Sequence, residues 1–192
     1  MIKFYKLQAK TQEITDEQIL QFCHQSAQVE RGFRLLMSKY QERLYWHVRR
    51  LVTEHEDAND VIQNVFVKVY RSIGNFEGKS KLYTWLYRIA TNEAITFLNK
   101  KKRRQTSSID EEETDLANRL EADHYFDGNA AQLRLQQALV TLPDKQRLVF
   151  NMRYFDEMSY KDISSSLNTS VGALKASYHH AVKKVEAFLK EE

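Results

Sequence analysis

Residues that interrupt helices are scarce in this chain, which has five glycines and one proline among 192 residues. That is too few for the many turns of a strand-rich fold. Apolar side chains recur instead at helical spacing over residues 29–52, in a stripe of Phe33, Leu36, Met37, Tyr40, Leu44, Val48 and Leu51. Further helices are predicted over residues 16–23, 57–73, 80–99, 130–139 and 144–154. The sequence therefore predicts an all-α protein.

Charge divides the chain into three parts. Residues 1–104 carry a net charge of +8, residues 105–130 carry −7 and residues 131–192 carry +2. The acidic part has little apolar content, which is typical of a flexible, self-repelling linker. We therefore expect two small helical domains, residues 15–104 and 131–190, joined by a flexible acidic linker over residues 105–130.

Several classes of protein are not supported by the sequence. No apolar run approaches the length of a membrane span, and the first residues lack the apolar core of a signal peptide. The only cysteine, Cys23, cannot form an internal disulfide, and it shows no zinc-site spacing with the six histidines. Glycine motifs that bind nucleotides are absent. We expect a cytoplasmic protein with no metal, no cofactor and no catalytic activity of its own.

The stretch over residues 76–104 combines three features that suit nucleic acid. A short loop with Gly78 precedes a predicted helix that carries Tyr83, Trp85 and Tyr87, and an unbroken basic run, Lys100 to Arg104, follows. Cations attract phosphates, aromatic rings stack on unpaired bases and amides contact base edges. The simpler alternative is a core helix with a solvated basic end.

The end of the chain has the pattern of a helix-turn-helix. Ser159 and Asp162 have the spacing of a capping box, Asn168 and Thr169 form the turn, and Ser170 caps the next helix. Its inner stripe is predicted to be Val171, Leu174, Tyr178, Ala181 and Val185. Its outer face carries small, basic and imidazole side chains, namely Gly172, Lys175, Ala176, His179, His180 and Lys183. Such a helix can enter a DNA major groove, although an ordinary helical hairpin would share the pattern.

The helix predicted over residues 57–73 has a mixed outer face. Its inner face is Val61, Ile62, Val65, Phe66, Val69 and Ile73, and the opposite face includes Asp60, Gln63, Asn64, Val67, Tyr70 and Arg71. An apolar Val67 beside Tyr70, ringed by polar groups, favours a small docking patch. Isolated exposed apolar residues are also common on ordinary surfaces.

Several motifs together resemble one family. They are DANDVIQNVF over residues 57–66, FEGKS over 76–80, YTWLYRIATN over 83–92, Leu142-Pro143, Arg153-Tyr154-Phe155, SYKDI over 159–163 and Val171-Gly172. The chain resembles the bacterial RNA polymerase sigma factors of the extracytoplasmic-function (ECF) group of the sigma-70 family. The resemblance covers about residues 15–104 and 131–190, and the run TWLYRIATN is its most specific part.

The resemblance implies a role for each part of the chain. Residues 15–104 would be sigma region 2, which binds core polymerase and recognises and melts the −10 element. Residues 131–190 would be region 4, which reads the −35 element. The linker would pass through polymerase near the template strand. The implied partners are core RNA polymerase, through its β′ and β subunits, promoter DNA and, in many relatives, an anti-sigma factor. The free protein is expected to be a monomer without membrane insertion.

The resemblance and the residue chemistry together give three sets of predicted contacts. Contacts with −10 DNA are assigned to Phe76, Lys79, Lys81, Arg88, Asn92, Lys100, Lys101 and Arg103. Contacts with −35 DNA are assigned to Ser170, Lys175, Ser177, His179, His180 and Lys183. Core polymerase contacts are assigned to Asp60, Gln63, Asn64, Val67, Lys68 and Arg71.

Two departures from the family pattern bear on these assignments. Asn64 stands where relatives often have Glu, within the polymerase-binding helix. The recognition helix has Lys175, Ser177 and His180 where relatives are commonly richer in Arg, and Lys and Ser lack the bidentate guanine contact of Arg. The −35 contact is therefore expected to be weaker or different in specificity.

Two other functions share the helix-turn-helix. A transcriptional repressor or activator would use it without a polymerase-binding helix, and usually as a dimer. A site-specific recombinase would place it after a catalytic domain, but the first domain is short and shows no nucleophile with clustered arginines.

Overall fold

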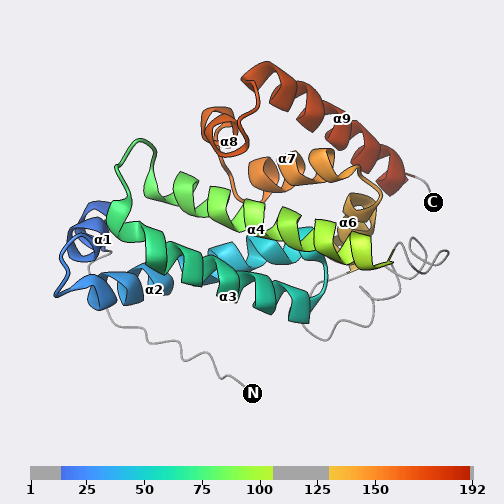
Figure 1. Cartoon of the computed structure of the whole chain (residues 1–192). Helices are drawn as coiled ribbons and strands as arrows, with labels where there is room; N and C mark the ends of the chain where they lie inside the picture. Colours follow the sequence, from blue (N-terminus) through green and yellow to red (C-terminus); the bar gives the residue numbers. More distant parts are fainter. Residues whose placement is uncertain (1–13, 106–129, 191–192) are drawn as a thin grey trace.

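The computed structural model describes residues 14–105 and 130–190, in which helices joined by short loops are the regular secondary structure and no strand is present (Figure 1). The elements are α1 (Asp16–Cys23), α2 (Val29–Val52), α3 (His55–Ser72), the 3-10 turn η1 (Ile73–Asn75), α4 (Leu82–Gln105), α6 (Ala130–Val140), α7 (Asp144–Tyr154), α8 (Tyr160–Leu167) and α9 (Val171–Lys190). The all-α prediction is confirmed. The predicted linker falls almost wholly on residues 106–129, outside the described part.

The first half is built on the α2 stripe. Leu36, Leu44 and Val48 are fully buried, where they meet the apolar faces of α3 and α4, and Figure 1 shows these long helices side by side. The short helix α1 begins with a capping box between Thr15 and Gln18. The helical spacing of the apolar residues in α2 thus predicts both the helix and the face that it buries.

The second half contains the predicted helix-turn-helix. Ser159 caps α8 by accepting from the backbone N–H of Asp162 at 3.1 Å. Asn168 ends α8 in the left-handed region, with φ of 50°, a conformation that Asn tolerates better than most residues. Ser170 then accepts from the backbone N–H of Ala173 at 3.3 Å and caps α9.

Two local expectations need correction. The basic run is not a tail beyond the helix, because α4 continues through it to Gln105; Lys and Arg are themselves good helix formers. Val171 is 38% exposed and does not belong to the inner stripe of α9, because it lies in the first turn, at the edge of the core.

The two halves share one hydrophobic core. Leu148, Met152, Met158 and Ile163 of the second half join the cluster that contains the buried residues of α2, α3 and α4. The contacts run from α7 to α2 and from α8 to α4, and Figure 1 shows α7 and α8 on the same side of α4. The sequence predicted both domains but not this packing of one on the other.

The close packing of Gly32 in α2 against Cys23 in α1 predicts a stability effect at Gly32. A Cβ at this position would lie 2.7 Å from both the backbone nitrogen and the sulfur of Cys23. Gly32→Ala should therefore destabilise the protein by about 1–3 kcal/mol through overpacking. A clear fall in the thermal unfolding midpoint would be the measurement.

Gly172→Ala is the matched control, because a Cβ there meets nothing within 4 Å. It should leave the midpoint unchanged or raise it, since Ala exceeds Gly in helix propensity by about 1 kcal/mol. Equal midpoints for the two variants would contradict the account of close packing between α1 and α2.

Candidate nucleic-acid interface

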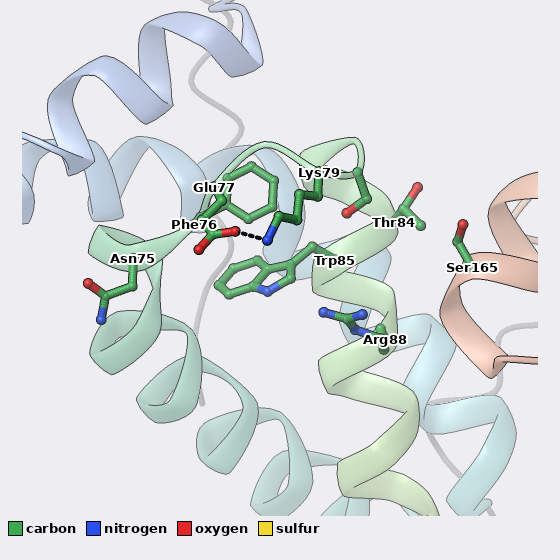
Figure 2. Close-up of a pocket in the computed structure, with 9 residues that line it drawn as sticks. Asn75, Phe76, Glu77, Lys79, Thr84, Trp85, Arg88 and Ser165 are labelled. Carbon is green, nitrogen blue, oxygen red and sulfur yellow. Dashed lines mark ion pairs between the residues drawn. The ribbon is translucent and has the colours of Figure 1, made fainter.

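A pocket lies where the loop after η1 meets the start of α4 (Figure 2). Its volume is about 330 Å³, and it is lined by Asn75, Phe76, Glu77, Lys79, Ser80, Thr84, Trp85, Arg88 and Ser165. The loop turns at Gly78, whose φ of +69° is the left-handed conformation that glycine adopts without strain. The loop and glycine turn predicted from sequence therefore form one wall of a cavity.

The wall of the pocket is aromatic and its rim is charged. The rings of Phe76 and Trp85 lie 5.1 Å apart between centroids, at 52° to each other, and Phe76 is 8% exposed. Arg88 is exposed on the same face of α4 as Trp85, and Glu77 and Lys79 form an ion pair at the rim (Figure 2). An aromatic wall with a polar rim is the chemistry that an extruded base requires.

The two amides near this pocket lie in different places. Asn75 lines the pocket, and sequence reasoning missed it. Asn92 is not among the lining residues; it lies on the solvent side of α4, about one turn beyond Arg88, and is exposed. That exposure does not fit a role for Asn92 as a buried structural amide. It leaves the Asn92 side chain accessible to a single strand of DNA that would run from the pocket along α4.

The cations assigned to the −10 set also differ in their surroundings. Lys79 lines the pocket, Lys81 is exposed just before α4, and Lys100 and Arg103 are exposed at the far end of α4. Lys101 instead turns toward the start of α3, where its ammonium lies 2.9 Å from Glu54 and 2.8 Å from Asp57. Burial alone would lower the pKa of Lys101, but the hydrogen bonds with these two carboxylates raise it. Lys101 is thus a structural cation as well as a predicted DNA contact.

The outer face of α3 is polar with a small apolar centre. Asp60, Gln63, Asn64, Lys68 and Arg71 are exposed around it. Val67 is 48% exposed and Tyr70 is 44% exposed, and the Tyr70 ring packs on Phe33 with centroids 5.0 Å apart. Lys68 pairs with Glu93 of α4. The predicted docking patch is therefore present as a surface, and Phe66, which is 7% exposed, faces the core.

The outer face of α9 presents the predicted recognition residues. Lys175, His179, His180 and Lys183 are exposed. Ser177 is half-buried, and Ser170 is engaged in capping the helix. The ammonium of Lys175 lies 5.9 Å from the ring centroid of Tyr160, which keeps this cation beside α8.

Neither a metal site nor a membrane-spanning helix is found in the described part of the chain. Among the described residues, no three His, Cys, Asp or Glu side chains cluster as a metal site would need. Within the same ranges, no helix combines the length and the apolar character that crossing a bilayer requires.

Comparison with known proteins identifies the family. Residues 36–104 match sigma-70 region 2, and residues 132–185 match sigma-70 region 4. The RNA polymerase sigma-H factor of Pseudomonas aeruginosa is 33% identical over 171 residues, covering 83% of this chain and 87% of that protein. The ECF RNA polymerase sigma-E factor of Escherichia coli K12 is 29% identical over 191 residues, covering 92% and 95%. This chain belongs to the ECF group of the sigma-70 family.

Solved structures share the fold of this sigma factor. The sigma factor RpoE of Bartonella quintana, in complex with the anti-sigma factor NepR, superposes with a TM-score of 0.69 at 22% identity, covering 83% of this chain and 98% of that one. CnrH, in complex with the cytosolic domain of CnrY, gives 0.67 at 21% identity, covering 92% and 98%.

The two neighbouring lysines of the basic run should separate structural from DNA-binding roles. Lys101→Ala removes both ion pairs and should lower the stability of the sigma factor by up to about 1 kcal/mol, because the groups are partly exposed. Lys100→Ala, on an exposed side chain, should leave the thermal midpoint unchanged. Equal midpoints would contradict a structural role for the contacts of Lys101.

Proposed function

We propose that this ECF sigma factor binds core RNA polymerase, recognises −35 and −10 promoter elements and promotes strand opening. One observation carries the proposal: a single chain presents a base-sized aromatic pocket with cations around it and, separately, a cationic recognition helix. A duplex-reading repressor needs only the second feature. A protein that captures an unpaired base needs the first.

The parts of the chain divide this work. Residues 15–104 serve as region 2, which binds core polymerase and recognises and melts the −10 element. Residues 131–190 serve as region 4, which reads the −35 element, and residues 105–130 join them. The matches to sigma regions 2 and 4 support the division.

Capture of a −10 base begins with its extrusion from the stack. The base enters beside Phe76 and Trp85, where aromatic contact offsets part of the cost of unstacking, a few kcal/mol. Arg88 and the amides of Asn75 and Asn92 are the candidates for contacts with its edge. Lys79, Lys81, Lys100, Lys101 and Arg103 hold the phosphates of the displaced strand, a contribution that is independent of sequence and falls with salt.

Recognition of the −35 element uses α9 in a major groove. Lys175, His179, His180 and Lys183 face the DNA, and Ser170 and Ser177 contact the backbone at its edge. Since none of these side chains is an arginine, the rigid planar fork that arginine offers to guanine is absent from this set. The −35 element should contribute less discrimination than the −10 element.

Binding to core polymerase uses the outer face of α3. Val67 and Tyr70 form the apolar centre, and Asp60, Gln63, Asn64, Lys68 and Arg71 form its polar rim, an arrangement that suits a small protein interface. The partner is the β′ subunit, and region 4 adds contacts with β. The free protein is a monomer that forms a 1:1 complex with core. An anti-sigma factor is a further expected partner, because the structural neighbour RpoE is a sigma factor in complex with the anti-sigma factor NepR.

Run-off transcription with purified core polymerase tests the function. The sigma factor should direct initiation at promoters that core alone ignores, with a preference for one base at the flipped −10 position. Asn92→Ala should flatten this preference at that single position. Lys100→Ala should weaken all promoters alike, because a lost phosphate contact carries no sequence information.

Two outcomes would count against the proposal. Absence of run-off product, together with failure to bind core in gel filtration at moderate salt, would favour the repressor. An equal loss on every promoter for Asn92→Ala would remove this residue from base recognition.

A further inference from the structure

Two acidic side chains of the second half form hydrogen bonds with the first half. Asp156 lies in the turn between α7 and α8, and Asp162 lies in the first turn of α8. Both carboxylates point at residues of α2 or α4, so they join segments that are 78 to 109 residues apart in the sequence. We call Asp156 and Asp162 the two carboxylate anchors.

The first anchor is buried at the centre of the contact. The side chain of Asp156 is 2% exposed and the His47 ring is fully buried. His47 Nδ1 lies 2.7 Å from one carboxylate oxygen, and Arg50 donates to the other at 2.7 Å. Since a carboxylate only accepts, the imidazole donates from Nδ1, which leaves Nε2 to meet Thr91 Oγ1 at 2.9 Å. A buried carboxylate without such partners would be strongly unfavourable.

The second anchor lies at the start of α4. Thr84 donates its hydroxyl to Asp162 at 3.3 Å, and the Lys81 ammonium lies 3.6 Å from the same carboxylate. Burial alone would raise the pKa of Asp162, but hydrogen bonds from Ser159, Tyr83 and Thr84 and the charge of Lys81 together lower it. The ionised form therefore stabilises this contact above the ordinary carboxyl pKa. That contribution is lost only as pH falls through the lowered value.

The second anchor occupies groups that the −10 strand would use. Lys81 is a predicted phosphate contact, and in this arrangement it faces a carboxylate from the same chain. Thr84 lines the base pocket while it donates to Asp162, and Ser165 of α8 lines the same pocket (Figure 2). A carboxylate thus stands where a phosphate would bind, and α8 forms part of the pocket wall.

We propose that the two carboxylate anchors hold this sigma factor in a closed arrangement that excludes the single-stranded −10 element until α8 is withdrawn from α4. The inference rests on the −10 role proposed above for the pocket. It assigns a regulatory role to Asp156 and Asp162, neither of which is among the predicted DNA contacts.

Two buried polar atoms at the contact oppose its stability. Among the described residues, Arg50 Nε and Asn151 Oδ1 are buried at this interface without a hydrogen-bond partner. Each such atom carries a desolvation cost that is recovered when the halves part and water enters. The recognition face of α9 is exposed in the closed arrangement. The closed form therefore blocks one DNA contact and leaves the other accessible.

Substitution of each anchor tests the proposal in the full-length protein. Asp156→Asn and Asp162→Asn should enlarge the radius of gyration in small-angle scattering. Both should tighten binding of a fluorescent single-stranded −10 oligonucleotide, since apparent affinity scales with the open fraction; if one molecule in ten is open, the gain is about ten-fold. Affinity for a −35 duplex should not change. Glu157→Gln is the matched control, because it removes the same charge one residue from Asp156, at an exposed side chain.

Other results would overturn the proposal. An unchanged radius of gyration in both variants, confirmed as folded by thermal melts, would show that the anchors do not hold the halves together. A larger radius of gyration without tighter −10 binding would show that the closed arrangement does not exclude the −10 strand. Equal gains on −10 and −35 DNA, or a gain in Glu157→Gln, would indicate a general effect of charge.

Failure of the function itself would look different. In that case no protein, wild type or variant, would prefer the −10 strand to a scrambled strand, whatever its radius of gyration. That result would overturn the exclusion of DNA together with the −10 role on which it rests.

Discussion

The arrangement of this sigma factor depends on one buried carboxylate. Asp156 is withdrawn from water and satisfied by His47 and Arg50 of α2, so the turn that carries it has a single favourable position. Breaking a buried pair by removing one partner typically costs about 3–5 kcal/mol. Together with the shared apolar core, this contact holds α7 and α8 beside α2 and α4, and Ser165 of α8 lines the pocket.

The pocket and the contact between the halves are therefore coupled. Thr84 belongs to both, since it lines the pocket and donates to Asp162. The free protein buries apolar residues of both halves in one core. The proposed polymerase-binding face of α3 is exposed on this closed form, so docking can precede the proposed opening. The account thus orders the events as docking, separation and capture of the base.

Most of the helices could be predicted because they depend on patterns of residues that are close in the sequence. The stripe of α2 and the caps at Ser159 and Ser170 are short-range signals, and each gave the correct element. The pocket was anticipated only as far as the family motif reached, through Phe76 and the turn at Gly78. Asn75 was missed because a single amide beside a turn forms no repeating pattern that would mark it in the sequence.

The contact between the halves had no comparable signal. Asp156 reads as part of a polar connection, and its partner His47 lies 109 residues away among apolar neighbours. The face that a helix buries in its own domain follows from periodicity, but pairing across domains depends on shape and on isolated polar residues.

The distance between the halves tests the central claim most directly. Fluorescence energy transfer can be measured between dyes at Gln41 and Lys184, both exposed, in a chain with the buried Cys23 replaced by alanine. The account predicts high transfer in the free sigma factor and a clear fall when core polymerase is added. Low transfer in the free protein, or transfer that core polymerase leaves unchanged, would contradict it.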